Sequence, residues 1–238
     1  MKIIVLTITP YKEKDAIINA ISEKESLTFL ARGIKNPKSK NVALNTPLTV
    51  ADIELMDGDF KHPILKSSKP ISTSLKMEMD THYLGSLLLI DEIMVNLFPE
   101  EDRYLMFSSL EKALDNIKNS GDWLMTLLIF MNHALTMGGF QLEANQCVMC
   151  GKKRDIVAFS FNDGGFICKD CFTDTIERDL NKTQMLLLRR IINNREYDIA
   201  IKDYNQEDAE LLLQKFIDHL QEAFGYNFKN LRLLTSEK

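Results

Sequence analysis

The sequence lacks an apolar segment typical of a membrane span, and it lacks a recognisable leader. The least polar stretch, residues 123–142, carries no charged residue but is interrupted by Thr126, Asn132 and His133, which is typical of a buried helix. The first fifteen residues contain a short apolar run without a small-residue cleavage site, so they predict a first strand and no signal peptide. We therefore expect a soluble cytoplasmic protein without a membrane partner.

Proline is missing from most of the chain, since all six prolines lie within the first 99 of 238 residues. Average composition is about 5% proline, so a stretch of 139 residues without proline indicates a different kind of structure after residue 99. Before residue 75 the apolar runs are short, rich in Ile, Val, Thr and Phe, and bounded by turn residues such as Asp57-Gly58, a dipeptide typical of tight hairpins. Five short strands favour a closed barrel of the OB-fold type, because closure removes exposed sheet edges. The predicted strands cover residues 2–9, 16–21, 27–31, 48–56 and 60–65.

From residue 74 onward the apolar spacing becomes helical. The residues that favour helix starts are Pro99, Asp122 and Asn205, and Gly225 favours a helix end. The fold class is therefore α+β and multidomain, with an OB-fold at residues 1–75, an α-helical domain at 76–146 and 176–238, and an insert at 147–175. Helices are predicted over residues 84–97, 100–117, 123–139, 182–193 and 206–224.

Only four cysteines occur, in two pairs that are separated by seventeen residues: Cys147 with Cys150, and Cys168 with Cys171. Two C-x-x-C pairs at this separation are typical of tetrahedral zinc ligation by four thiolates. We therefore predict one structural Zn²⁺ held by all four, in a zinc ribbon. A weakened or iron-binding site is one alternative, and disulfide or redox chemistry is another, although disulfides are rare in the cytosol. None of the four histidines is followed two residues later by glutamate, as a zinc deaminase requires.

The chain is acidic overall, with a net charge of -5, which argues against a uniformly basic surface for nucleic acid. Residues 81–146 carry nine acidic and three basic side chains, whereas no acidic residue lies between Glu25 and Asp52. A basic segment beside aromatic rings is typical of barrels that bind single-stranded nucleic acid. The alternative is that the basic segment is a solvated loop and that the aromatic residues belong to the core. The candidate nucleic-acid-binding residues are the cations Arg32, Lys35, Lys38 and Lys40 and the aromatic residues Tyr11 and Phe29.

Several short segments in this order resemble the RecO family of bacterial recombination mediator proteins. The resemblance spans the chain to about residue 175, and the cysteine region with its glycines and phenylalanines is its most specific part. The segments are Val5-Leu6-Thr7, Pro10-Tyr11 with Asp15, residues 31–40, Leu97-Phe98-Pro99-Glu100-Glu101-Asp102, Gly139-Phe140, residues 147–151, Phe159-Ser160 and residues 164–168.

The resemblance implies an N-terminal OB-fold, a helical domain and an inserted zinc ribbon. It also implies a non-enzymatic role in DNA repair by homologous recombination. RecO proteins bind single- and double-stranded DNA, anneal complementary strands, and help RecR load RecA onto DNA covered by single-stranded-DNA-binding protein. We accordingly expect a location in the cytoplasm, at the nucleoid. Asn36 and Asn41 stand where many members carry arginine.

Two other functions are alternatives to this one. A zinc-ribbon protein-interaction module or transcription-associated adaptor would bind proteins and would not anneal DNA. A metal-dependent hydrolase would need a cluster of histidines and carboxylates, and the sequence shows no such motif.

Overall fold

The computed structural model describes residues 1–56, 62–74, 80–176, 178, 180–194, 197 and 201–234. The Asp57-Gly58 dipeptide, predicted as a hairpin turn, lies outside the described residues. The chain forms two compact units, Met1–Gly121 with Phe228–Lys238, and Asp122–Asn227. These units divide the chain at Gly121, and the three-part division at residues 75, 146 and 175 stays a prediction.

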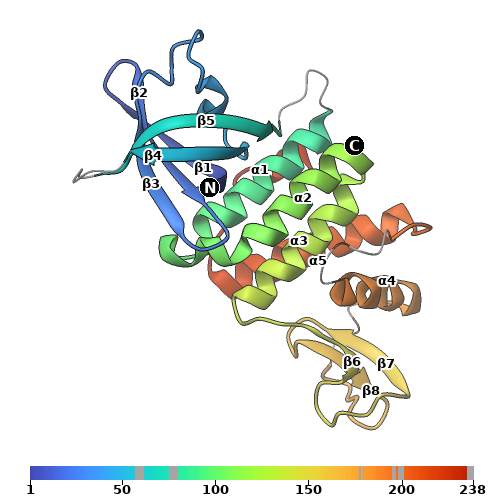
Figure 1. Cartoon of the computed structure of the whole chain (residues 1–238). Coiled ribbons are helices and arrows are strands. Elements are labelled where there is room, and N and C mark those ends of the chain that lie inside the picture. The colour runs from blue at the N-terminus through green and yellow to red at the C-terminus, as the bar shows by residue number, and fades with distance from the viewer. Residues whose placement is uncertain are drawn as a thin grey trace. The chain divides into compact units, whose positions relative to one another are not determined.

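The first five strands close into a barrel in the order β1-β2-β3-β5-β4, with β4 pairing back to β1 (Figure 1). Strands β3 and β5 are parallel, and the other neighbours are antiparallel. This arrangement is OB-like, which confirms the predicted barrel. The strands are β1 (Lys2–Tyr11), β2 (Asp15–Ile21), β3 (Ser26–Ala31), β4 (Val50–Met56) and β5 (Ile64–Ser72).

The fifth strand was predicted at the wrong place, over residues 60–65 rather than Ile64–Ser72. Only its first two side chains are buried, and the other seven, including Pro70, are exposed or half-buried. The apolar pattern of the sequence stops at Leu65, where the buried side chains stop. The backbone of β5 nevertheless continues to pair with β4 as far as Ser72. Strand pairing thus extends beyond the part of the sequence that buries side chains.

Helices accompany the barrel within the first unit. The predicted helix over residues 100–117 is two elements, a 3-10 helix followed by α2. The final segment of the chain returns to α1, where the buried Glu92 carboxylate accepts hydrogen bonds from the amides of Lys229 (2.8 Å) and Asn230 (3.2 Å). Glu92 therefore anchors residues 229–230 to α1. The elements are η1 (Val42–Asn45), α1 (Thr81–Asn96), η2 (Glu100–Met106), α2 (Phe107–Ser120) and η3 (Leu231–Leu233).

Asp91, beside Glu92 on α1, has a buried Oδ1 without a hydrogen-bond partner among the described residues. Burial and the adjacent Glu92 charge raise the pKa of Asp91 to about 7. The folded state therefore keeps this proton when the unfolded state has lost it, and the free energy of unfolding falls as the pH rises from about 4 to 7. We expect Asp91→Asn to increase stability by up to about 4 kcal/mol at pH 8 and by little at pH 4.

Urea unfolding of the wild-type protein and of Asp91→Asn at both pH values measures this difference. Asp52→Asn is the matched control, because Asp52 is an exposed carboxylate of β4, and its replacement is expected to change stability by less than about 0.5 kcal/mol. An equal gain for Asp91→Asn at pH 4 and pH 8 would contradict the prediction.

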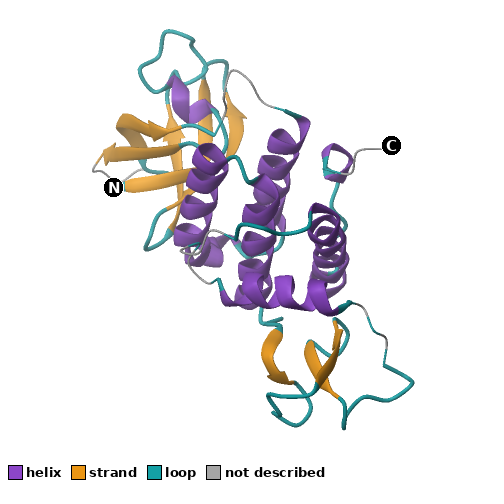
Figure 2. Ribbon diagram, turned by 90° about the vertical axis from the view of Figure 1, so that its right-hand side faces the viewer, coloured by secondary structure: helices purple, strands orange, loops and turns teal. Residues whose placement is uncertain are grey.

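The described part of the second unit combines α3, α4 and α5 with a small sheet of strand order β6-β8-β7. Figure 2 shows the helices of the chain in purple and its strands in orange. The predicted helix caps are confirmed: Asp122 accepts from the amide of Met125 (3.1 Å), and Asn205 accepts from the amide of Asp208 (2.9 Å). No helix in the described ranges combines the length and the apolar character that crossing a membrane requires. The elements are α3 (Trp123–Met137), β6 (Glu143–Cys147), β7 (Ile156–Ser160), β8 (Gly165–Cys168), α4 (Lys182–Asn193) and α5 (Gln206–Phe224).

Candidate nucleic-acid interface and metal centre

The basic segment, residues 32–40, is a structured loop that leaves β3 at the end of the barrel. Its backbone folds into successive turns, since the amide of Asn36 donates to Gly33 O (3.1 Å) and the amide of Ser39 donates to Asn36 O (2.8 Å). Ile34, inside the segment, and Leu44, in η1 beyond it, are fully buried in the barrel core. The apolar side chains thus fix the loop to the barrel and leave its cations at the surface.

The four predicted cations lie close together along this segment. Arg32, Lys38 and Lys40 are exposed and Lys35 is half-buried. Among the described residues, no carboxylate pairs with any of the four. Unpaired cations on one loop create the positive potential that attracts phosphate.

Two further lysines were missed by the sequence analysis. Lys12 and Lys14 are exposed in the turn between β1 and β2, and the amide of Lys35 donates to Lys14 O (3.1 Å). In the sequence, Lys12 and Lys14 alternate with Glu13 and Asp15, so these four residues together carry no net positive charge. Only the hairpin turn, packed against the loop that follows β3, brings these lysines beside the basic segment.

The two aromatic candidates have different positions. Tyr11 ends β1 and is 41% exposed, with the Lys12 ammonium 5.4 Å from its ring centroid. Phe29 is fully buried in the barrel core, so its prediction as a base-stacking residue is wrong. Alternation along β3 turns Phe29 inward together with Ala31, and a core aromatic cannot be distinguished from a stacking aromatic by residue type alone.

Farther along the β1-β2-β3 face, away from the β1–β2 turn, polar side chains of the strands are hydrogen-bonded to one another and to η2. The Asn19 amide donates to Thr7 Oγ1 (2.8 Å), the Thr28 hydroxyl donates to Asn19 Oδ1 (2.8 Å), and the same hydroxyl lies 3.2 Å from the carboxylate of Glu100 in η2. OB-folds bind oligonucleotides on strands 2 and 3 and at the loop between strands 1 and 2. The end with Tyr11 and the basic segment is therefore the candidate nucleic-acid interface.

Two asparagines, Asn36 and Asn41, shape this loop. Asn36 Oδ1 accepts from the amide of Lys38 (3.0 Å), and Asn41 Oδ1 accepts from the hydroxyl of Ser68 on β5 (2.8 Å). Both side chains therefore contribute to the loop conformation instead of adding charge.

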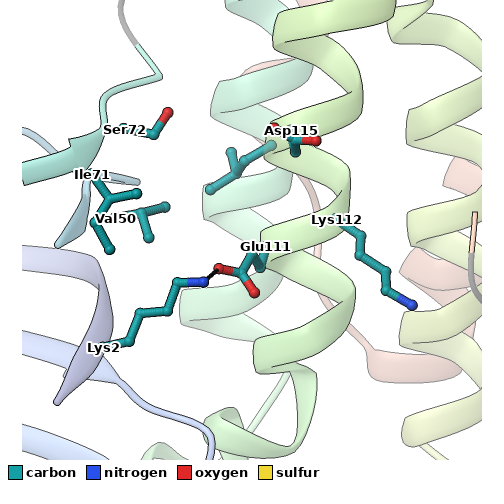
Figure 3. Close-up of a pocket in the computed structure, with 8 residues that line it drawn as sticks. Lys2, Val50, Ile71, Ser72, Glu111, Lys112 and Asp115 are labelled. Carbon is teal, nitrogen blue, oxygen red and sulfur yellow. Dashed lines mark ion pairs between the residues drawn. The ribbon is translucent and has the colours of Figure 1, made fainter. Parts of the chain in front are cut away.

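A cavity of about 360 Å³ lies beside β5 and α2 within the first unit (Figure 3). Lys2 and Glu111 form an ion pair there, and Figure 3 shows Lys112 extending away from this pair. The lining contains no histidine or cysteine, and we assign it no catalytic role. The lining residues are Lys2, Val50, Ile71, Ser72, Glu111, Lys112, Leu114 and Asp115.

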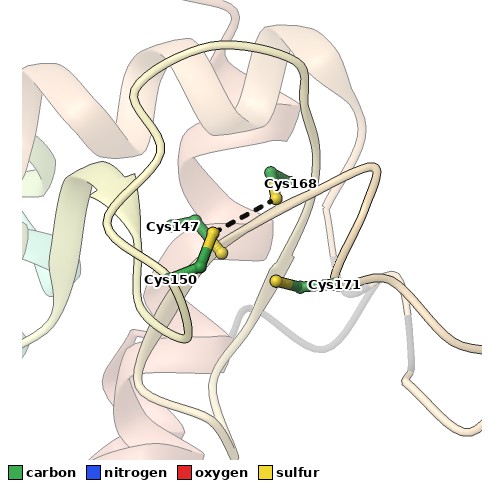
Figure 4. A group of neighbouring side chains, drawn as sticks. All are labelled: Cys147, Cys150, Cys168 and Cys171. Carbon is green, nitrogen blue, oxygen red and sulfur yellow. Dashed lines mark hydrogen bonds between the residues drawn. The ribbon is translucent and has the colours of Figure 1, made fainter.

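The four cysteines gather at one end of the small sheet (Figure 4). Cys147 ends β6 and Cys168 ends β8. Each pair closes a tight turn: the amide of Gly151 donates to Cys147 O (2.8 Å), and the amide of Cys171 donates to Cys168 O (3.1 Å). Gly151 has a φ of +75°, which favours glycine at this turn.

The sulfur geometry fits a four-thiolate metal site. All four sulfurs lie within 4.8 Å of one another. The Cys150 and Cys168 sulfurs are 3.6 Å apart, whereas a disulfide requires about 2.05 Å. Tetrahedral Zn–S bonds of about 2.3 Å place sulfurs about 3.8 Å apart. The cluster is thus compatible with one bound metal ion.

The electrostatics of the cluster also favour a cation. Burial alone would raise the pKa of the Cys147 thiol, but hydrogen bonds from the backbone of Cys168, Cys150 and Met149 lower this pKa to about 6. The neighbouring thiols of Cys150 and Cys168 raise the pKa of Cys171. Four thiolates at this distance repel one another, and a divalent cation would remove that repulsion.

Lys152, which directly follows the first cysteine turn, forms ion pairs with two carboxylates. Its ammonium lies 3.0 Å from the carboxylate of Asp155 and 2.9 Å from that of Asp170. Lys152 therefore joins the two turns of the ribbon by pairing with carboxylates.

Aromatic packing connects the ribbon to α5 within the second unit. The ring centroid of Phe161 lies 6.0 Å from that of Phe216 and 5.4 Å from that of His219. Phe159 packs edge-on against both Phe161 and Phe166. The ribbon fold and the helical part of this unit thus share a buried aromatic cluster.

Family models match almost the whole chain. The model "Recombination protein O N terminal" matches residues 1–72, and "Recombination protein O C terminal" matches residues 79–225. Proteins named DNA repair protein RecO are similar to it: that of Bacillus pumilus is 24% identical over 99% of this chain and 94% of its own length, and that of Bacillus cereus is 25% identical over 97% and 94%. That of Syntrophomonas wolfei is 27% identical over 71% of this chain and 68% of its own. The chain therefore belongs to the RecO family of DNA repair proteins.

Proposed function

We propose that this protein binds single- and double-stranded DNA through the barrel end that carries the basic segment, and that it anneals complementary strands. The observation that carries this proposal is the joining of two cation-rich loops, residues 12–14 and 32–40, beside the exposed ring of Tyr11 on an OB-like barrel. Membership of the RecO family supports the same function.

The contacts would be made mainly to phosphates, with Tyr11 as a stacking face for a base. Arg32, Lys35, Lys38 and Lys40 together with Lys12 and Lys14 would give six phosphate contacts. At about 0.7 per contact, the slope of log K against log salt is about -4 for single strands. Backbone contacts leave the base edges available for pairing, which is what annealing requires.

We infer that the four cysteines hold one structural Zn²⁺. Their number, their separation and the closed set of four sulfurs support zinc with no open coordination position. When bound, the ion would supply charge neutralisation and would cross-link the two turns of the ribbon. The protein itself would make and break no covalent bonds.

The wider role that we propose is to help RecR load RecA onto DNA covered by single-stranded-DNA-binding protein, in the cytoplasm at the nucleoid. The resemblance to RecO proteins supports these partners. The acidic tail of the single-stranded-DNA-binding protein would need cations on the helical part of the chain, and those available in the sequence are Arg103, Lys112, Lys118, Arg189, Arg190 and Arg195. Of these, Arg103 and Arg190 already donate to the backbone carbonyls of Phe98 and Lys202, so they are less suited to that contact.

A strand-annealing assay with two complementary oligonucleotides, one carrying a fluorophore and the other a quencher, tests the function. The wild-type protein is expected to accelerate duplex formation, and the acceleration is expected to decline as salt rises. Absence of acceleration together with absence of single-strand binding would support the rival function of a zinc-ribbon interaction module or transcription-associated adaptor.

A further inference from the structure

We propose that Asp15 is a positioning residue, whose carboxylate holds the basic segment against the β1–β2 turn so that the cations of both loops form one phosphate-binding surface. This inference rests on the proposed function of DNA binding.

The contacts of Asp15 place it at the junction of the two loops. Asp15 is the first residue of β2 and pairs with Tyr11 across the hairpin. Its Oδ1 accepts a hydrogen bond from the amide of Gly33 (2.8 Å). Gly33 has a φ of +65°, a conformation that other residues rarely adopt. Two residues later, the amide of Lys35 donates to Lys14 O (3.1 Å), so two hydrogen bonds join the turn to the segment.

The charge of Asp15 has the wrong sign for a surface that binds phosphate. It lies among Lys14, Arg32 and Lys35, and by electrostatics alone a carboxylate here weakens the attraction of an anion. The backbones that it joins carry side chains that repel one another. A hydrogen bond to the charged carboxylate is among the stronger ones available to an amide, so Asp15 can hold these loops together against that repulsion.

Two substitutions of Asp15 distinguish its hydrogen bond to the basic segment from the effect of its negative charge. Asp15→Asn removes the charge but keeps a side-chain oxygen that can accept from Gly33, whereas Asp15→Ala removes both. If only charge mattered, both variants would bind single strands more tightly than the wild-type protein. If Asp15 positions the segment, Asp15→Asn binds at least as tightly as wild type, and Asp15→Ala binds about fivefold more weakly, as expected for the net effect of one hydrogen bond.

Fluorescence anisotropy with a labelled thirty-nucleotide oligothymidylate, measured over a series of salt concentrations, gives these affinities. The salt slope of Asp15→Ala should also be shallower than that of Asp15→Asn, because fewer cations reach phosphates together. Lys69→Gln is the control for removal of one exposed charge from another part of the barrel, and it is expected to leave the slope unchanged.

Limited digestion with a lysine-specific protease measures the position of the segment without DNA. Cleavage after Lys35, Lys38 and Lys40 should be faster in Asp15→Ala than in wild type, with Asp15→Asn close to wild type. Thermal melting verifies that the barrel is folded, and Asp15→Leu, which is similar in size and has no acceptor, replaces Asp15→Ala if that variant does not fold.

Equal affinities and equal cleavage rates for Asp15→Ala and Asp15→Asn would overturn the positioning role. A wild-type protein that binds no oligonucleotide would overturn the proposed function instead, and the cleavage rates would still decide whether Asp15 holds the segment in place.

Discussion

Replacing Cys168 by serine is expected to abolish metal binding and to unfold the ribbon of the second unit. Cys168 is fully buried at the end of β8, and its sulfur is 3.6 Å from that of Cys150. Structural zinc contributes about 10–16 kcal/mol in isolated zinc-finger peptides, so loss of one thiolate should lower the free energy of unfolding by at least roughly 3 kcal/mol. Elemental analysis should give one zinc per wild-type chain and close to none in Cys168→Ser.

The consequences should extend beyond the four cysteines, because the ribbon shares its aromatic cluster with α5. Phe159, Phe161 and Phe166 are buried, and they would become accessible to a hydrophobic dye in the variant. Met149→Ser is the control: Met149 lies between Cys147 and Cys150 in the other turn of the cluster and is 50% exposed, so this variant should keep its metal and its melting temperature. Full thermal stability of Cys168→Ser, or a metal-free wild-type protein, would contradict a structural zinc site.

Features that depend on local spacing were predictable from the sequence. A C-x-x-C pair places its two sulfurs together when it forms a turn, and the pairing of β6 with β8, which end at Cys147 and Cys168, then brings all four within 4.8 Å. The caps at Asp122 and Asn205 follow from the same kind of local chemistry, since each side chain accepts from an amide three residues later. The caps and the turn within each cysteine pair depend on local sequence alone.

Features that depend on strand register were not predictable. Lys12 and Lys14 join the basic segment only because the hairpin turn contacts the loop after β3, and their sequence neighbours Glu13 and Asp15 conceal the charge. Phe29 was predicted as a stacking residue from its residue type, with a core aromatic as the alternative, and the register of β3 places its side chain in the core. Register decides which face a side chain occupies, and it depends on pairing across the barrel.

Reversing the charge of Lys35, Lys38 and Lys40 together, by substitution with glutamate, is expected to remove most single-strand binding and annealing. Three phosphate contacts are lost, and three repulsive charges are placed on the same loop, where like-charge contacts cost several kcal/mol. We expect at least about a hundredfold loss of affinity at low salt, and a salt slope reduced from about -4 to about -2. Anisotropy with a labelled single strand gives the affinity, and the quenching assay gives the annealing rate.

The control for this variant changes the net charge of the whole protein by the same amount at other places. Lys24, Lys182 and Lys202 are exposed and lie outside the basic segment; Lys24 is in the turn at the opposite end of the β2–β3 hairpin. With both triple variants compared at about 0.1 M salt, their joint substitution by glutamate should reduce affinity by less than about threefold, because these lysines are not part of the basic segment and the Debye length of about 10 Å at this salt limits long-range repulsion. If both triple variants lost affinity equally, total charge would control binding. If only the first lost affinity, the barrel end with Tyr11 and the basic segment would be the DNA-binding surface of a protein that is acidic overall.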